Sequence, residues 1–104
     1  MRIELLWFQG CPNHLKAELL LRDVMRECGV DAAVTRIEVP DEATGNRVCF
    51  PGSPTIRIDG RDVEPANNPC TCEDCTPRCR IYLTDRDMAG IPTRAWIKTA
   101  VCGE

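Results

Sequence analysis

The pattern of apolar and polar positions divides the chain into short strands and amphipathic helices. Residues 5–8 form an unbroken apolar run, which is typical of a strand buried on both faces. Beyond it, apolar residues recur at helical spacing at Ala17, Leu20, Leu21, Val24 and Cys28. Gly29 ends this helix, and residues 33–39 alternate as a second strand. Because strand–helix–strand crossovers are right-handed, we predict that the two strands are parallel.

The second half of the chain predicts a hairpin and two more helices. Residues 42–49 follow a helix start at Pro40-Asp41-Glu42, and a last helix begins at Pro92. Two short strands, 55–59 and 61–64, meet at Asp59-Gly60, which is a strong antiparallel hairpin signal. Residues 66–78 have no periodicity and predict a long loop. An extended segment at 80–83 and a turn at 85–90 complete the order.

Composition and charge narrow the function. The chain has 104 residues, 43% of them apolar and 28% charged, as expected of one soluble domain. A net charge of -3 gives no basic surface, so we expect no binding to nucleic acid or to anionic membranes. No apolar run suits a signal peptide or a bilayer span, and we therefore expect a cytoplasmic location. In that reducing compartment, eight cysteines favour thiol chemistry or metal binding over a disulfide framework.

Cys11 lies where the first strand gives way to the first helix. Gly10 permits a tight turn, and Pro12 suits the first helical position, which makes Cys11 the predicted N-cap. The unpaired N–H groups of a helix N-terminus favour a thiolate over a thiol. Since the thiolate is both nucleophile and metal ligand, we predict a reactive or metal-ligating Cys11. The alternative is a small buried apolar residue.

The order β-α-β-α-β-β-α, with a cysteine before the first helix and Ser53-Pro54-Thr55 before the third strand, resembles the thioredoxin fold. The chain also resembles a group of small bacterial thioredoxin-like proteins, some of them selenoproteins and some labelled alkylmercury lyases. The segments that carry this resemblance are FQGCPNH (8–14), GSPTI (52–56), VEP (63–65), CRIY (79–82) and GIP (90–92).

The resemblance implies an α/β fold with a four-stranded mixed sheet and three helices. A single thioredoxin-like domain would cover residues 1–104, with residues 66–79 as a cysteine-rich loop insertion. It also implies a cis peptide bond before Pro54, facing Cys11.

Position 14 departs from the thioredoxin pattern. A local dithiol requires a second cysteine there, but the chain has His14, which could lower the pKa of the Cys11 thiol or carry its proton. The alternative for His14 is an exposed polar residue. Another thiol must then resolve a mixed disulfide at Cys11, and the predicted one is Cys49, five residues before Pro54. The alternative for Cys49, a packing residue at the end of the second helix, is somewhat favoured over the resolving role, and for Cys28 and Cys102 we favour structural roles.

Four cysteines cluster in the loop with the spacing C-x-C-x2-C-x3-C: Cys70, Cys72, Cys75 and Cys79. Thiolates at such spacing can close on Zn²⁺, which would order a loop without apolar residues. An iron–sulfur cluster or another thiophilic metal such as Cu(I) or Hg(II) would also accept four thiolates. One or two disulfides are the alternative, and we favour the metal.

The leading hypothesis is a thiol-dependent redox protein that uses Cys11 opposite Pro54. If such a protein is an enzyme, we expect a thiol-disulfide oxidoreductase. Its partner would be a protein or a low-molecular-weight thiol or disulfide, and the backbone of Ser53 or Thr55 would pair with an extended substrate. The rival hypothesis is a soft-metal-binding or metal-transfer protein that uses the loop. An organomercurial lyase is the third, and least favoured because no carboxylate can be placed at Cys11. A purely structural role is the fourth.

Overall fold

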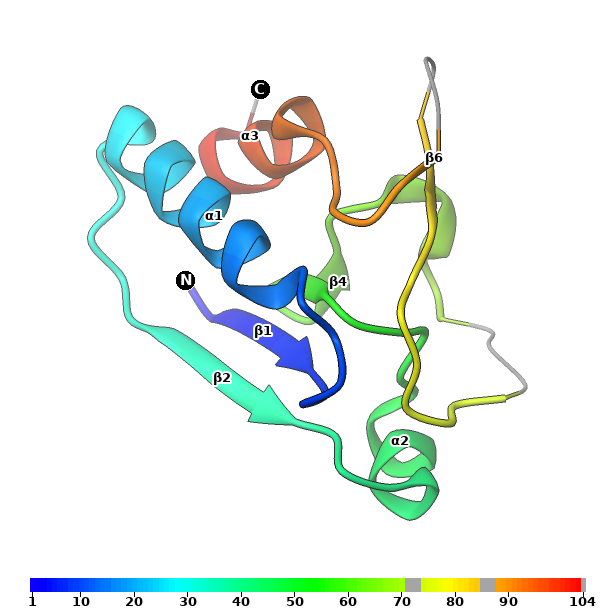
Figure 1. The fold of residues 1–104 in the computed structure, drawn as a ribbon. Coiled ribbons are helices and arrows are strands. Elements are labelled where there is room, and N and C mark those ends of the chain that lie inside the picture. The colour runs from blue at the N-terminus through cyan, green and yellow to red at the C-terminus, as the bar shows by residue number, and fades with distance from the viewer. Residues whose placement is uncertain (71–73, 85–87, 104) are drawn as a thin grey trace.

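The computed structural model describes residues 1–70, 74–84 and 88–103. Within these residues the chain is mixed α/β, with three α-helices around a four-stranded sheet that contains parallel and antiparallel pairs (Figure 1). The fold class predicted from the sequence is therefore confirmed at this level. None of the described helices is long and apolar enough to cross a membrane.

The sheet has the strand order β2-β1-β3-β4. β1 (Ile3–Trp7) runs through its middle, because both of its faces are apolar. β2 (Val34–Glu38) pairs with it in parallel, as predicted, with Ile3 opposite Val34. β3 (Thr55–Ile58) lies antiparallel on the other side of β1, and β4 (Arg61–Asp62) extends the sheet from β3.

The β3–β4 hairpin turns at the predicted dipeptide. Asp59 has φ 53° and Gly60 has φ 85°, so both central residues are left-handed, as a type I′ turn requires. The Asp59 carboxylate also accepts a hydrogen bond from the Arg2 backbone N–H at 2.7 Å. This contact ties the hairpin to the start of β1.

Two helices cover one face of the sheet. α1 (His14–Cys28) and α3 (Arg94–Cys102) lie side by side there (Figure 1). Gly29 ends α1 in the left-handed conformation, as predicted, and Thr93 caps α3 by accepting from the Trp96 backbone N–H at 3.1 Å. The core between helices and sheet contains Ile3, Leu5, Ala17, Leu21, Val24, Met25, Ile56, Ile58, Val63, Ile97 and Val101.

The other face carries α2 (Glu42–Val48) and a second core. Asp41 caps this helix by accepting from the Thr44 backbone N–H at 2.8 Å. The second core consists of Leu6, Val39, Phe50 and Cys75. Because Leu5 and Leu6 point to opposite faces of β1, each core receives one of them.

The segment after the hairpin is less regular. A 3-10 helix spans Pro65–Asn67, and β5 (Tyr82–Leu83) pairs antiparallel with β6 (Met88–Ala89). β5 confirms the predicted extended segment, whereas the strand β6 was expected to be part of a turn. Residues 85–87 of that predicted turn lie outside the described residues. The peptide bonds Ser53–Pro54 and Asn68–Pro69 are cis.

Two disulfides join distant parts of the described chain. Cys28–Cys102 links the C-terminal ends of α1 and α3, with a Cα–Cα distance of 5.5 Å. Cys49–Cys70 links the end of α2 to the loop, with a Cα–Cα distance of 6.5 Å. The sequence analysis favoured thiol chemistry or metal binding over disulfides, and for these four cysteines the structure shows disulfides instead. The predicted structural roles of Cys28 and Cys102 take the form of a cross-link between two helices.

Candidate thiol site

Cys11 lies in the turn between β1 and α1, but it is not the N-cap. The Cys11 backbone N–H donates to the Phe8 carbonyl oxygen at 3.1 Å, which closes a tight turn. The N-cap is Asn13, whose carbonyl oxygen accepts the first helical bond from Ala17 at 3.0 Å. The predicted cap position of Cys11 is therefore wrong, because the turn through Pro12 uses two more residues before the helix begins.

The Cys11 side chain is buried beside the residue that precedes Pro54. Cys11 is only 1% exposed, and its thiol donates to the Ser53 carbonyl oxygen at 3.4 Å. That oxygen belongs to the Ser53–Pro54 peptide, so Pro54 adjoins Cys11 as the resemblance implies. Ser53 is itself fully buried, and within the described residues its hydroxyl oxygen has no hydrogen-bond partner. Such a hydroxyl is a spare donor on the residue whose carbonyl oxygen accepts from Cys11.

His14 contacts the backbone of Cys11. Its Nδ1 atom is 2.7 Å from the Cys11 carbonyl oxygen, so the proton must be on Nδ1 for a hydrogen bond to form. Its ring stacks on Trp7, with 4.6 Å between the ring centroids. These contacts orient the turn around Cys11. The predicted role of His14 as a proton carrier for the thiol stays a prediction.

The segment of residues 78–80 lies along Ser53 as a parallel β-bridge. The Ser53 N–H donates to the Arg78 carbonyl oxygen at 2.7 Å, and the Arg80 N–H donates to the Ser53 carbonyl oxygen at 2.8 Å. The backbone of Ser53, which we expected to pair with an extended substrate, is therefore occupied by the chain's own loop. The residue between the two hydrogen-bonding positions is Cys79.

Gly52 allows this close approach. Its φ is +130°, and a Cβ atom there would lie 2.8 Å from the Cβ atom of Arg80. Any other residue would therefore strain the backbone and push the 78–80 segment away from Ser53.

Cys79 meets Cys11 at this bridge. The Ser53 carbonyl oxygen accepts from the Cys11 thiol, and the Ser53 backbone is bridged to Cys79, which unlike Cys11 is exposed. Partial loss of hydration, and then the interaction with Cys11, raise the pKa of the Cys79 thiol above its ordinary value. The structure thus brings two cysteines together, one accessible and one buried. Such a pair can exchange between dithiol and disulfide.

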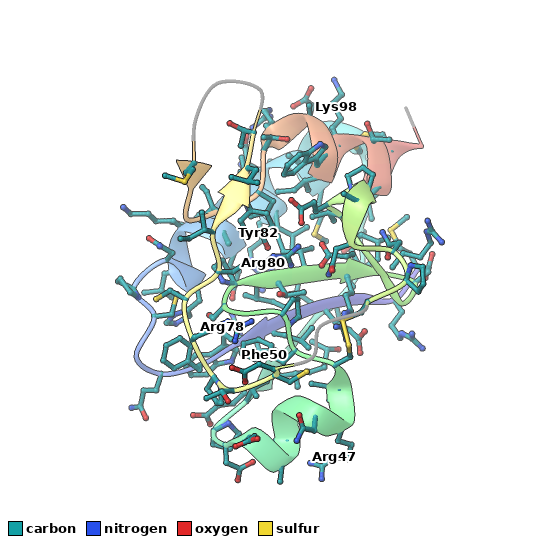
Figure 2. The ribbon with its side chains drawn as sticks, turned by 90° about the vertical axis from the view of Figure 1, so that its right-hand side faces the viewer. Arg47, Phe50, Arg78, Arg80, Tyr82 and Lys98 are labelled. Carbon is teal, nitrogen blue, oxygen red and sulfur yellow. A yellow bond between two sulfur atoms is a disulfide. The ribbon has the colours of Figure 1, made fainter. Side chains whose placement is uncertain are left out.

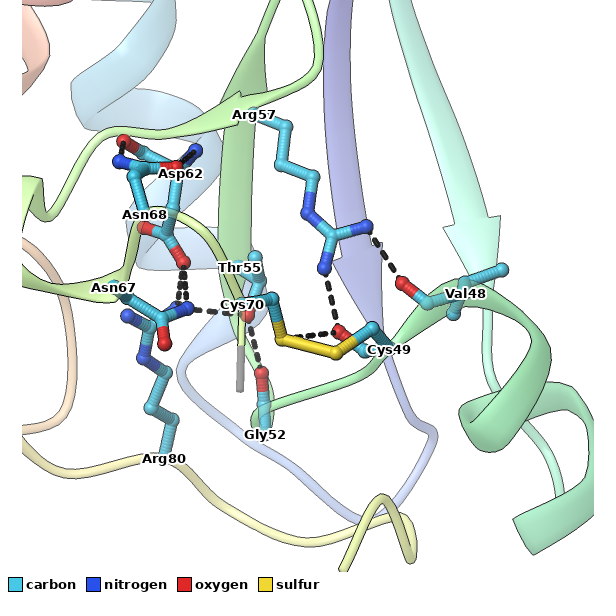
Figure 3. Close-up of a disulfide and its surroundings, with 10 residues drawn as sticks. All are labelled: Val48, Cys49, Gly52, Thr55, Arg57, Asp62, Asn67, Asn68, Cys70 and Arg80. Carbon is cyan, nitrogen blue, oxygen red and sulfur yellow. Dashed lines mark hydrogen bonds and ion pairs between the residues drawn. A yellow bond between two sulfur atoms is a disulfide. The ribbon is translucent and has the colours of Figure 1, made fainter. Parts of the chain in front are cut away.

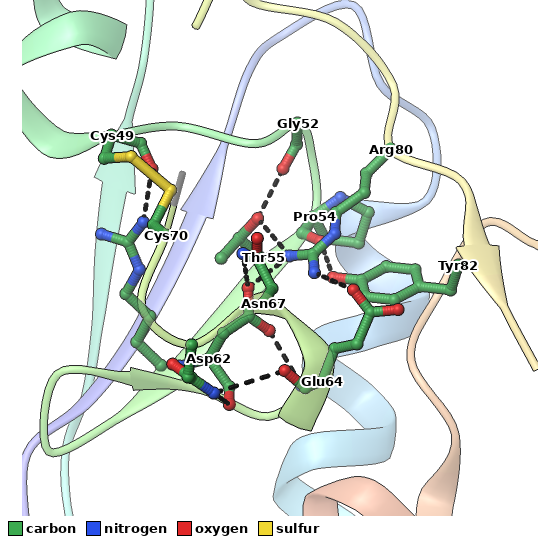
Figure 4. A network of polar contacts seen from close by, with 12 residues as sticks. Cys49, Gly52, Pro54, Thr55, Asp62, Glu64, Asn67, Cys70, Arg80 and Tyr82 are labelled. Carbon is green, nitrogen blue, oxygen red and sulfur yellow. Dashed lines mark hydrogen bonds and ion pairs between the residues drawn. A yellow bond between two sulfur atoms is a disulfide. The ribbon is translucent and has the colours of Figure 1, made fainter. Parts of the chain in front are cut away.

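Arg80 anchors the segment that carries Cys79 (Figures 2 and 4). Its side chain is 5% exposed and donates to Asp62 at 2.7 Å, to Glu64 at 2.7 Å and to the Thr55 hydroxyl at 3.0 Å. Burial opposes the charge most strongly, but Tyr82, Asp62 and Glu64 outweigh it and raise the pKa of Arg80. A buried arginine with these partners is a firm attachment for the loop.

Tyr82 completes the anchor (Figure 4). Its hydroxyl donates to the Pro54 carbonyl oxygen, and its ring lies 4.2 Å from the guanidinium carbon of Arg80. The segment 78–82 is therefore attached at two places. Its backbone bonds to Ser53, and its Tyr82 hydroxyl bonds to the Pro54 carbonyl oxygen. Burial raises the pKa of Tyr82, which keeps the hydroxyl protonated as a donor.

The other predicted site cysteines lie elsewhere. Cys49 is bound to Cys70, so in this structure it is not a thiol that could resolve Cys11, and Cys70 is not a thiolate. Cys75 is buried in the second core, where its carbonyl would lie 1.9 Å from a Cβ atom at Gly45. Cys72 lies outside the described residues.

The three described cysteines of the predicted metal site therefore lie in three different places. Cys70 is in a disulfide, Cys75 is in the second core, and Cys79 is at the bridge to Ser53. Within the described part of the chain, no three His, Cys, Asp or Glu residues are grouped as a metal site. The binding of zinc or another thiophilic metal stays a prediction.

The sequence did not identify the partner of Cys11. Cys79 was assigned to the metal loop, and Arg80, Asp62 and Glu64 were not assigned to a site. One signal was present: Arg80 and Tyr82 alternate with Ile81 and Leu83, as in a strand with one buried face. Comparisons of the chain with protein-family models, curated proteins and solved structures find no match.

Proposed function

We propose that the chain is a thiol-dependent redox protein with a thioredoxin-like fold, in which Cys11 and Cys79 are the reacting pair. The fold proposal is supported by the strand order β2-β1-β3-β4, with α1 and α3 on one face of the sheet and α2 on the other. It is also supported by the contact of the Cys11 thiol with the peptide oxygen before Pro54.

The observation that carries the redox proposal is that both cysteines meet Ser53, whose carbonyl oxygen accepts from the Cys11 thiol at 3.4 Å and whose backbone is bridged to Cys79. Thiols that lie close together can form a disulfide with little movement of the backbone. Cys79 is held in place by its two neighbours. Arg78 and Arg80 both hydrogen-bond to the Ser53 backbone, and the Arg80 side chain is buried. A cysteine needed only for packing would not require an exposed sulfur at this position.

Accessibility decides the order of the steps. A substrate disulfide must touch the sulfur that attacks it, and Cys79 is exposed whereas Cys11 is 1% exposed. Because the pKa of Cys79 is raised, only a small fraction of it is thiolate, and this fraction attacks one substrate sulfur and forms a mixed disulfide. The other substrate sulfur leaves as a thiolate that takes a proton from water. Cys11 then loses its proton to water and attacks the Cys79 sulfur. The Cys11–Cys79 disulfide forms, the second substrate thiolate leaves, and two electrons have passed to the substrate.

The experiment is to trap the intermediates. Protein with Cys11 and Cys79 reduced is mixed with one equivalent of a neutral disulfide, bis(2-hydroxyethyl) disulfide, quenched with acid and mapped by peptide mass spectrometry. The wild type should yield the Cys11–Cys79 disulfide. C11S should stop as a mixed disulfide on Cys79, and C79S should react at neither position. A Cys11 adduct that forms at an unchanged rate in C79S would overturn the proposed order, and absence of a Cys11–Cys79 disulfide would overturn the pair.

A further inference from the structure

A cavity of about 380 Å³ lies beside the Cys49–Cys70 disulfide, which Figure 3 shows with the surrounding residues. Both cysteines line its wall, together with Arg57, Arg61 and Asn68. Both cysteines are partly exposed, so a small molecule in the cavity can reach the sulfur atoms. This volume is at the lower end of the range for small-molecule sites.

The charge of the cavity is positive. The Arg57 guanidinium donates to the carbonyl oxygens of Val48 at 2.8 Å and Cys49 at 2.6 Å, which are neutral acceptors. Glu4, opposite Arg57 on β1, is paired with Arg2 at 3.7 Å. Arg61 is exposed at the rim. Among the described lining residues the carboxylate is Asp62, which is paired at 2.7 Å with Arg80, a cation that it shares with Glu64. The cavity therefore favours an anionic occupant.

The backbone at Cys49 is unusual for its residue type. Each described α-helix ends in a left-handed residue: Gly29 after α1, Gly103 after α3 and Cys49, with φ 50°, after α2. Glycine is the usual residue there because a side chain is strained in this conformation. Strain of this kind at a cavity wall is a pointer to function. The cysteine side chain is therefore present for its sulfur.

We propose that the Cys49–Cys70 disulfide is a second redox site, which an anionic low-molecular-weight thiol reduces from this cavity. A carboxylate on the thiol would be attracted to Arg57 and Arg61 while its sulfur meets the disulfide. The proposal does not depend on a reaction between Cys11 and Cys79.

The step balances with the thiol as the reductant. The incoming thiolate attacks the Cys49 sulfur, a new mixed disulfide forms at Cys49, and the Cys49–Cys70 bond breaks. Cys70 is the leaving sulfur, because the C-terminus of α2 disfavours a thiolate on Cys49. The Cys70 sulfur lies 3.2 Å from the Cys49 carbonyl oxygen, so after taking a proton from water it can donate to that oxygen. A second thiol then releases Cys49 as a thiol, and two thiols have become one disulfide.

The test compares three small thiols of different charge: 3-mercaptopropionate (anionic), 2-mercaptoethanol (neutral) and 2-aminoethanethiol (cationic). Oxidised protein is treated with each at low ionic strength, and cleavage of both disulfides is followed by alkylation and peptide mass spectrometry. Rate constants are expressed per thiolate. For Cys49–Cys70 the anionic thiol should react fastest and the cationic one slowest, by about threefold per unit of charge. Cys28–Cys102, which packs against the core, is the control within the same molecule.

Two variants separate binding from general reactivity. R61Q should reduce the preference for the anionic thiol by about threefold. R47Q removes an exposed charge on α2 that does not line the cavity, and should leave the preference unchanged. Equal charge preferences at the two disulfides, an R61Q result identical to R47Q, or absence of the Cys49–Cys70 bond from protein purified under alkylating conditions would each overturn the proposal.

Discussion

The exposed Cys79 pairs with Ser53, whose backbone bonds to the residues on both sides of Cys79 and whose carbonyl oxygen accepts from the buried Cys11 thiol at 3.4 Å. The loop thus presents a cysteine to Cys11 in the way that an extended substrate strand would. An external substrate strand that used the same Ser53 groups would have to displace residues 78–80. In the proposed mechanism it does not, because the substrate reacts first at the exposed Cys79.

The C11A variant should make Cys79 more reactive near neutral pH. The interaction with Cys11 raises the pKa of Cys79 in addition to burial, and C11A leaves only the effect of burial. The pKa of Cys79 should fall, and alkylation by iodoacetamide at pH 8 should become about threefold faster. The full pH–rate profile is the measurement, because better access alone would raise the plateau without moving the midpoint. An unmoved midpoint would contradict the contact.

The S53A variant should keep or increase stability. The buried Ser53 hydroxyl has no partner within the described residues, so its removal should change the free energy of unfolding by about 0 to +1 kcal/mol. The matched control is T55V, because the Thr55 hydroxyl donates to the Gly52 carbonyl oxygen at 2.6 Å and accepts from Arg80. T55V should lose about 1–3 kcal/mol in urea denaturation. An equal loss in both variants would contradict the assignment.

The G52A variant should detach the 78–80 segment from Ser53. A Cβ atom at Gly52 collides with Arg80, and its φ of +130° disfavours alanine. We expect a loss of about 1–3 kcal/mol in stability and a lower pH midpoint for alkylation of Cys79. G103A is the control, because Gly103 also has a positive φ, of +77°, but has no atom within 4 Å of the added Cβ. A lowered midpoint in G103A as well would show that the effect is not local.

The R80M variant should be strongly destabilised. Arg80 is the cation bound to Asp62, whose side chain is 1% exposed, and its loss leaves that buried carboxylate unpaired. The expected cost is about 3–5 kcal/mol in chemical denaturation. R80K retains the charge but not the two-armed geometry that reaches Asp62 and Glu64, so it should lie between R80M and the wild type. A loss below about 1 kcal/mol in R80M would contradict a buried ion pair.

The contribution of Glu18 should disappear in acid. Hydrogen bonds from Arg36 first, and then from Arg22, lower the pKa of Glu18 below its ordinary value of 4.5 despite the opposing effect of burial. A lowered carboxyl pKa stabilises the fold above the ordinary value, and that stability is lost as the pH falls through the pKa of the folded state. E18Q should therefore cost on the order of 1 kcal/mol at pH 7 and nothing at pH 2. E38Q, at an exposed position, is the control in pH-dependent melting.

Local sequence determined most of the secondary structure. The helical spacing of α1, its glycine end, the Asp59–Gly60 turn and the apolar β1 run are each decided by neighbouring residues. The parallel pairing of β1 with β2 followed as well, because crossovers have a fixed hand. The burial of Cys11 next to Pro54 was expected only through the resemblance to a known fold.

Tertiary structure decided which cysteines meet. Sequence spacing grouped Cys79 with the nearby loop cysteines. In the fold, Arg80 pairs with Asp62 of β4 and with Glu64 just after it. These ion pairs hold Cys79 against Ser53, beside Cys11. Cys28 and Cys102 meet because two helices pack on one face. Contacts between residues far apart in the chain depend on how whole elements pack, which local periodicity does not encode. The sequence thus determined that Cys11 lies in the turn between β1 and α1, and only the fold determined which thiol it meets.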